Sequence, residues 1–193
     1  AQKVVDGGFG HRNLWKSDGT PEGTVQVTED QPALPQELVA LNGDLYISAY
    51  LPHGSDWTPA IWKSDGTRTG TEVLARNLSA RQFAAVDGRL YFSGYDYDDP
   101  QGSELWTSNG TEAGTHPVRA AAPTQDSHPI PLSVWQNVLY FAADDGLHGS
   151  QLWRSDGTTA GTRVVAEVSP FAPTLTTGVE VHGHLLFEGR TAV

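Results

Sequence analysis

The chain has 193 residues, of which 38% are hydrophobic, with 21 glycines, 12 prolines, no cysteine and a formal net charge of −11. This length can bury a hydrophobic core without disulfides, and the Gly- and Pro-rich composition excludes a disordered chain and favours an all-β protein with many turns. The negative charge excludes nucleic acid as an expected partner, because twelve Lys and Arg residues cannot form the basic surface that a phosphate backbone requires.

Two features of the sequence bear on where the protein acts. No apolar run approaches the roughly 18 residues of a membrane span, so no membrane span is expected. The chain starts at Ala1 without Met, and no apolar signal segment follows, which favours a processed chain that has been exported. We therefore expect an extracellular or cell-surface location.

The first predicted element is a hairpin in residues 13–27, NLWKSDGTPEGTVQV, and it recurs three times. An apolar strand enters the Ser-Asp-Gly-Thr turn, where Asp can bond its own backbone, and a Val-rich strand leaves it. The other copies are AIWKSDGTRTGTEVL from Ala60, ELWTSNGTEAGTHPV from Glu104 and QLWRSDGTTAGTRVV from Gln151. Their tryptophans, spaced by 47, 44 and 47 residues, are Trp15, Trp62, Trp106 and Trp153.

A second predicted hairpin alternates with the first. Its copies are LVALNGDLYISAY from Leu38, AAVDGRLYFSGY from Ala84, SVWQNVLYFAAD from Ser133 and VEVHGHLLFEGR from Val179. In each copy an apolar run meets a short turn and a second apolar run follows, which is a strong hairpin signal. Two hairpins per repeat predict a four-stranded antiparallel meander, whose strands we letter a to d, with strand c carrying the Trp.

Four-stranded repeats of 40 to 50 residues are typical of β-propellers. Complete blades are expected at about 38–77, 83–120 and 132–168. The chain starts with strands c and d and ends with strands a and b, so 1–30 and 179–193 are expected to pair as a fourth blade. The prediction is one domain over 1–193, an all-β four-bladed β-propeller. Two chains could instead complete each other, which leaves both a monomer and a ring-completing homodimer open.

The segment Glu104–Thr111, ELWTSNGT, and its three cousins resemble the ELWxxDGT repeat of large secreted and cell-surface bacterial proteins. This chain departs from the pattern at four places, where Asn13, Ala60 and Gln151 replace the Glu and Asn109 replaces the Asp. The strand order also resembles that of WD40 and kelch propellers. Because the family is defined by its repeat, the resemblance implies a propeller fold, an exported protein and adhesion or recognition, and it transfers no catalytic residue.

Residues that recur in every copy are interpreted as structural. The turn residues Asp18, Asp65, Asn109 and Asp156 are expected to cap their own turns rather than to bind a metal. The four repeat tryptophans are expected to anchor the core. Function is therefore expected where the copies differ, in the loops between strands b and c and in the connections between blades, which share one face.

Aromatic side chains in these loops suggest a ligand site. A sugar ring can stack on an aromatic face while neighbouring carboxylates and amides bind its hydroxyls. The candidate ligand-binding residues are Tyr50, Trp57, Tyr95, Tyr97, Asp98 and Phe171. The favoured function is a secreted lectin-like or adhesive propeller that recognises a glycan or surface polymer. Aromatic packing of the loops, with a purely structural repeat and no ligand, is the alternative.

Histidines on the same face suggest a second alternative, a metal-binding propeller or metalloenzyme. If they converge near the channel they could bind Zn or Cu, whereas the structural interpretation is that loop histidines in Gly-rich turns are exposed or cap their turns. The candidate ligands are His11, His53, His128 and His148. The run Asp96–Asp99 has the alternating oxygens of a Ca²⁺ loop but lacks the Gly and distal Glu of an EF-hand, so we interpret it as a solvated acidic loop. No nucleophile or metalloprotease motif is present, and no catalytic residue is predicted.

Overall fold

The computed structural model describes residues 13–29, 33–53, 56–118, 126–170 and 178–191. Over these ranges the fold is all-β, and eighteen strands form six antiparallel sheets. Within the same ranges there is no helix of sufficient length and apolar character to cross a membrane.

Three of the sheets are four-stranded meanders, as the repeat predicts. Sheet 1 contains β3 (Ala33–Leu41), β4 (Asp44–His53), β5 (Asp56–Ser64) and β6 (Thr71–Arg76). Sheet 2 contains β7 (Leu78–Val86), β8 (Arg89–Asp96), β9 (Ser103–Ser108) and β10 (His116–Pro117). Sheet 3 contains β11 (Ile130–Trp135), β12 (Val138–Asp144), β13 (Ser150–Ser155) and β14 (Arg163–Ala166). Each strand pairs with its neighbour in the chain, so strands a to d follow one another across every sheet.

The N-terminal and C-terminal parts of the chain form the other three sheets, each of two strands. The N-terminal hairpin pairs β1 (Trp15–Lys16) with β2 (Val25–Gln26), which correspond to strands c and d. The C-terminal hairpin pairs β16 (Gly178–Val181) with β17 (His184–Phe187), and β15 (Val168–Pro170) with β18 (Gly189–Thr191). Of these, β16 and β17 correspond to strands a and b. Together the two hairpins hold the four strands of one further repeat.

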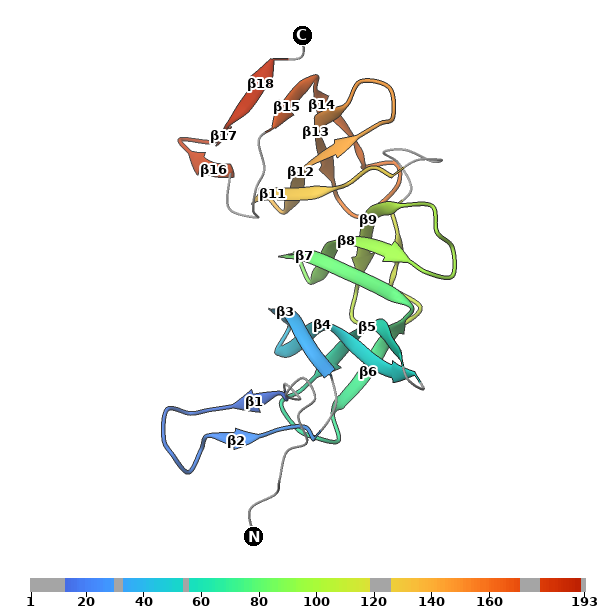
Figure 1. Cartoon of the computed structure of the whole chain (residues 1–193). Helices are drawn as coiled ribbons and strands as arrows, with labels where there is room; N and C mark the ends of the chain where they lie inside the picture. The colour runs from blue at the N-terminus through green and yellow to red at the C-terminus, as the bar shows by residue number, and fades with distance from the viewer. Residues whose placement is uncertain (1–12, 30–32, 54–55, 119–125, 171–177, 192–193) are drawn as a thin grey trace.

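The expected pairing of the two ends is not observed in the described part of the chain, where β1–β2 and β16–β17 remain separate sheets. The elements follow an arc, with the N-terminal hairpin at one end and the C-terminal hairpin at the other (Figure 1). The strands β3, β7, β11 and β16, all of type a, succeed one another along its inner side. Each hairpin packs against the sheet next to it in sequence.

The hydrophobic core is divided among the interfaces between neighbouring sheets. Between sheets 1 and 2, the side chains of Tyr46, Ile61 and Leu74 lie in one cluster with Phe92 and Trp106. Equivalent positions form the interface of sheets 2 and 3, where the cluster includes Tyr91, Leu105, Val118, Phe141 and Trp153. Alternation along each strand produces this arrangement, because successive residues face the preceding and the following sheet in turn.

The same kind of cluster binds the terminal hairpins to the arc. Leu14 and Val27 of the N-terminal hairpin pack with Trp62 of sheet 1. At the other end, Leu185 and Phe187 pack against the cluster of sheet 3. Each hairpin therefore has one covered face, and it uses the same repeat positions for this contact as a complete sheet does.

The same hydrogen bonds occur in all four repeat turns, three of which are Ser-Asp-Gly-Thr and one Ser-Asn-Gly-Thr. Asp18 Oδ1 accepts bonds from the Thr20 N–H at 2.9 Å and from the Thr20 hydroxyl at 2.7 Å. The same pair of bonds recurs at Asp65, Asn109 and Asp156. The bonds from the threonines lower the pKa of the three aspartates. Because Asn109 makes the same bonds without a charge, the turn requires an acceptor oxygen, and the structural interpretation is confirmed.

The prediction that the repeat tryptophans anchor the core is right for three of them and wrong for Trp15. Trp62, Trp106 and Trp153 are 4%, 8% and 5% exposed, whereas Trp15 is 57% exposed. In complete sheets the indole lies on strand c opposite an apolar residue of strand b, for example Phe92 opposite Trp106. The N-terminal hairpin has no strand b beside Trp15 in the described residues, which leaves the indole in solvent.

Candidate functional site: a polar cleft on the inner side of the arc

A cleft of about 690 Å³ opens where strands a of sheets 1 to 3 begin, beside the end of strand b in sheet 2. Its walls come from β3, β7, β8, β9 and β11 and the residues that flank them. The polar lining residues are Gln36, Glu37, Ser79, Arg81, Gln82, Ser93, Tyr95, Tyr97, Ser103 and His128. The lining thus combines two phenols with carboxamides, a carboxylate, a guanidinium and hydroxyls.

A β-bulge in β7 shapes one wall of the cleft. The register of β7 on β8 shifts between Arg81 and Ala84, and Gln82 adopts a left-handed φ of +58°. In a regular strand two consecutive side chains would point to opposite faces. The bulge instead lets both Arg81 and Gln82 reach the cleft. The Phe83 N–H donates to Glu37 Oε2 at 3.4 Å, so β3 also holds the bulge.

Two of the predicted ligand residues form the aromatic wall. Tyr95 and Tyr97 stand two residues apart on one side of the chain, with ring centroids 4.9 Å apart and planes inclined by 73°. Tyr97 is 59% exposed, so its ring is available to a ligand. Tyr50 is not part of the cleft lining, and its hydroxyl accepts a bond from Gln36 Nε2 at 3.3 Å.

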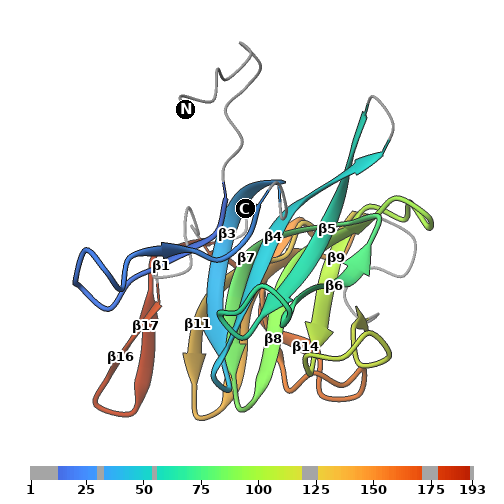
Figure 2. The same cartoon turned by 90° about the horizontal axis from the view of Figure 1, so that it is seen from below.

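The other predicted ligand residues do not line the cleft. Asp98 accepts hydrogen bonds from Asn77 Nδ2 on both carboxylate oxygens at 2.9 Å, and it therefore secures the loop that carries Tyr97. Trp57 lies opposite Pro52 in the β4–β5 hairpin, which projects beyond the neighbouring strands (Figure 2), and its side chain is 45% exposed. Phe171 lies outside the described residues.

The predicted histidine ligands are distributed over different elements. His128 lines the cleft, and its Nδ1 lies 3.2 Å from Asp126 Oδ1. That oxygen also accepts the Ser103 N–H at 2.8 Å, which ties the segment before β11 to β9. His11 lies outside the described part of the structure, and His53 ends β4. Over the described ranges no group of three or more His, Asp and Glu side chains is arranged to hold a metal ion.

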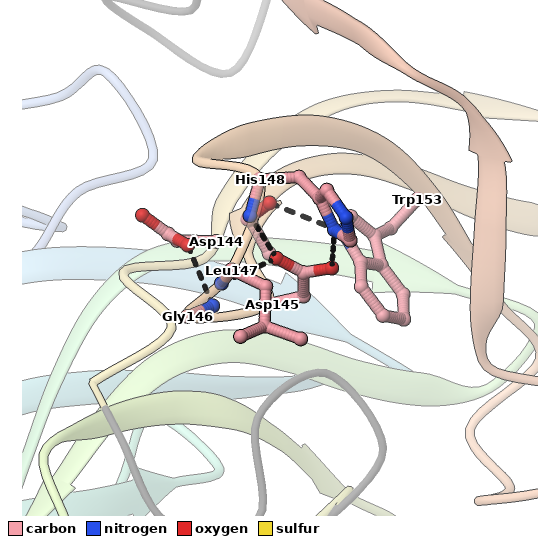
Figure 3. A network of polar contacts seen from close by, with 7 residues as sticks. Asp144, Asp145, Gly146, Leu147, His148 and Trp153 are labelled. Carbon is pink, nitrogen blue, oxygen red and sulfur yellow. Dashed lines mark hydrogen bonds and ion pairs between the residues drawn. The ribbon is translucent and has the colours of Figure 1, made fainter.

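The fourth histidine, His148, belongs to a self-contained loop of sheet 3 (Figure 3). Its Nδ1 lies 2.7 Å from Asp145 Oδ2, and Asp145 Oδ1 accepts the N–H groups of Leu147 and His148 at 2.9 and 2.8 Å. These bonds, first among them that from the His148 ring, lower the pKa of Asp145 to about 2. The bond to Asp145 raises the pKa of His148 above 6.5.

The Asp145–His148 contact predicts how this loop responds to pH. Because folding raises the pKa of His148, this residue stabilises the folded state fully below pH 6.5. That stabilisation is lost as the pH rises through the raised pKa. Because folding lowers the pKa of Asp145, this residue stabilises the folded state fully above pH 3.8. That stabilisation is lost as the pH falls toward 2. In an NMR titration, Asp145→Asn should return the pKa of His148 toward 6.5.

A matched control for that titration is Asp144→Asn. Asp144 Oδ1 accepts the Gly146 N–H at 2.7 Å and belongs to the same loop without bonding the imidazole (Figure 3). This variant should leave the titration of His148 where it is. An equal shift in both variants would contradict the assigned contact.

The acidic run after β8 also uses its carboxylates within the chain. Asp96 Oδ1 accepts the Asp98 N–H at 2.9 Å, and Asp99 Oδ1 accepts the Gln101 side-chain amide at 3.0 Å. With the Asn77 bonds to Asp98, each of the three carboxylates has an N–H donor. This arrangement agrees with the interpretation of the run as an acidic loop.

The polar residues on strands a were not predicted as site residues. The apolar alternation is readable only from Leu38 and Phe83 onward, whereas β3 and β7 begin at Ala33 and Leu78. Register shifts between Ala33 and Glu37, and between Arg81 and Ala84, interrupt the alternation there. A usable signal was the polar pair that directly precedes the alternating run in both repeats, Gln36–Glu37 and Arg81–Gln82.

In comparisons with known proteins, no protein-family model and no curated protein matched this chain.

Proposed function

We propose that this protein binds a glycan or another polyhydroxylated surface polymer in the inner cleft. The single observation that carries the proposal is the Tyr95–Tyr97 pair in a cleft whose remaining lining is largely polar. An aromatic face stacks on the apolar side of a sugar ring, and amide, carboxylate and guanidinium groups bind the hydroxyls. The volume of about 690 Å³ falls within the range of small-ligand sites.

The proposal places the three sheets as blades of a β-propeller, with strands a toward the axis and the cleft at its mouth. The arc of four-stranded meanders with type a strands on the inner side supports this architecture. The resemblance of the Leu-Trp and Ser-Asp-Gly-Thr repeats to the ELWxxDGT family supports an exported protein that acts in recognition or adhesion.

A glycan array followed by calorimetry with the tightest glycan tests the function. Tyr97→Ala should weaken binding at least tenfold, about 1.4 kcal/mol, because Tyr97 offers the most exposed ring of the cleft. Its exposure also means that truncation should leave the fold intact, which circular dichroism checks.

Trp57→Ala is the matched control, since it removes an exposed aromatic side chain outside the cleft lining. It should change the dissociation constant by less than about twofold. Silence of the wild-type protein on the array and in pull-downs with bacterial surface polysaccharide would refute the proposal. A larger loss for Trp57→Ala than for Tyr97→Ala would remove the cleft as the binding site.

A further inference from the structure

We propose that two copies of this chain close into one ring, with strand b of each C-terminal hairpin pairing with strand c of the other copy's N-terminal hairpin. The ring would contain the three complete sheets of each copy and two composite sheets, one at each junction. This inference concerns assembly and does not depend on the identity of a ligand.

The register of the proposed junction follows from the complete sheets. Strand b meets strand c with Ile47 opposite Trp62 in sheet 1, and with Phe92 opposite Trp106 in sheet 2. The equivalent residue of the C-terminal hairpin is Phe187, at the end of β17. The junction therefore places Phe187 of one copy opposite Trp15 of the other.

One position earlier in strand b, the same rule pairs a further two residues. Tyr46 lies opposite Lys63 in sheet 1. By the repeat, Leu186 of one copy lies opposite Lys16 of the other. The edges of β1 and β17 that would meet have no strand beside them in the described residues, so each offers backbone donors and acceptors to a further strand.

Apolar side chains that are buried in the other repeats are exposed at the two ends of the arc. Leu186 is 55% exposed, whereas Tyr46 and Tyr91, which occupy its position in sheets 1 and 2, are each 2% exposed. Val181 is 40% exposed, against 8% for Leu41 and 4% for Val86. These positions face the next sheet in the arc, and the C-terminal hairpin has none in front of it in the described structure.

The last strand of sheet 3 and the N-terminal hairpin also expose apolar residues whose equivalents in the other repeats are buried. Val165 is 46% exposed, whereas its equivalents Leu74 and Val118 are 8% and 3% exposed. Trp15 is 57% exposed, against at most 8% for the other repeat tryptophans. Side chains that the repeat buries elsewhere are thus uncovered toward the ends of the arc, where the proposed junctions would form.

A contact between the sheets leads to the same conclusion. The Tyr46 hydroxyl lies where a Cβ on Gly110 would be, and the Tyr91 hydroxyl lies likewise at Gly157, so strand b of one sheet supports the turn of the next. At the equivalent glycines of the N-terminal hairpin and sheet 1, Gly19 and Gly66, no described atom lies within 4 Å of that position. In the proposed ring, the strand b that supports each of these two turns would belong to the other copy.

The partner is a second copy because the arc separates the two hairpins within one chain (Figure 1). Each hairpin is held to its neighbouring sheet by apolar residues, Leu14 and Val27 at one end and Phe187 at the other. Pairing within a chain would require the arc to tighten until its ends met. A second copy related by a twofold axis would bring both complementary ends together and complete two junctions at once.

Cysteine cross-linking and mass measurement test the assembly. Light scattering should give the wild-type chain twice its monomer mass. The chain has no cysteine, so Lys16→Cys and Leu186→Cys introduce the only thiols. Mild oxidation of a mixture of the two single variants, one of them carrying a size tag, should yield a covalent dimer of one tagged and one untagged chain.

The control pair combines Lys16→Cys with Glu180→Cys, because Glu180 lies on β16 and faces no proposed partner strand. It should give no cross-link above background. A monomeric wild-type mass, or a Lys16→Cys/Leu186→Cys double variant that oxidises within one chain, would overturn the proposal. If a variant fails to fold, the mass of the wild-type chain still decides between the outcomes.

Discussion

Replacing Trp106 by alanine is expected to lower the free energy of unfolding by about 3–5 kcal/mol. The indole is 8% exposed and stacks on Phe92, with ring centroids 6.2 Å apart and planes 20° apart. It also covers Gly94 so closely that a Cβ there would collide with the ring. Truncation would leave a cavity at the interface of sheets 1 and 2, because the β-strands around it cannot collapse inward.

Denaturant unfolding measured by circular dichroism checks the expected loss. Trp57→Ala serves as the control, because it deletes an equally large side chain that is 45% exposed, and it should change stability by less than about 0.5 kcal/mol. A loss below about 1 kcal/mol for Trp106→Ala would show that the interface between the sheets contributes little.

The second large effect is expected for Gly110→Ala, which should lower the free energy of unfolding by about 2–4 kcal/mol. Two penalties add, since Gly110 has a φ of +85° and the Tyr46 hydroxyl occupies the space that a Cβ needs. Gly66→Ala isolates the first penalty. Gly66 has a φ of +84° in the same type of turn, but no described atom lies within 4 Å of the position that its Cβ would take.

Equilibrium unfolding of the two variants gives the difference directly. Gly66→Ala should cost about 1 kcal/mol, the strain alone. Adding Tyr46→Phe to Gly110→Ala removes the obstructing hydroxyl. It should recover most of the stability that Gly110→Ala loses beyond the loss of Gly66→Ala. Equal losses for the two glycine variants would mean that the tyrosine yields freely and does not couple the sheets.

The meander of each repeat was predictable because its signals are local. Alternating apolar residues, short turns and the Ser-Asp-Gly-Thr motif each act within about fifteen residues, and all three complete sheets follow them. The capping of the turns by Asp18 and its equivalents was predictable for the same reason.

Whether the two ends of the chain pair with each other was not predictable from these signals. The C-terminal strand b has the same register and apolar face whether its partner strand c belongs to its own chain or to another copy. The choice depends on the curvature of the arc, which results from packing at the interfaces between sheets. No single repeat contains that information.

The cleft was predictable in part. Its face of the molecule and the residues Tyr95, Tyr97 and His128 follow from the strand order and from the departures between copies. Arg81 and Gln82 were missed because a bulge suspends the alternation by which strands are recognised. The contact between Asp145 and His148 depends on a loop conformation that composition alone does not specify.

The sharing of cores between sheets has a consequence for cooperativity. Phe92 and Trp106 of sheet 2 lie in one hydrophobic cluster with residues of sheet 1, so sheet 2 has no separate core. Stability then resides in nearest-neighbour couplings along a one-dimensional array, as in repeat proteins. An isolated chain would open from its two ends, so amide protection would be greatest in β8 and fall toward β1 and β17. Closing the array into a ring would abolish that gradient, since a ring has no end from which to unravel.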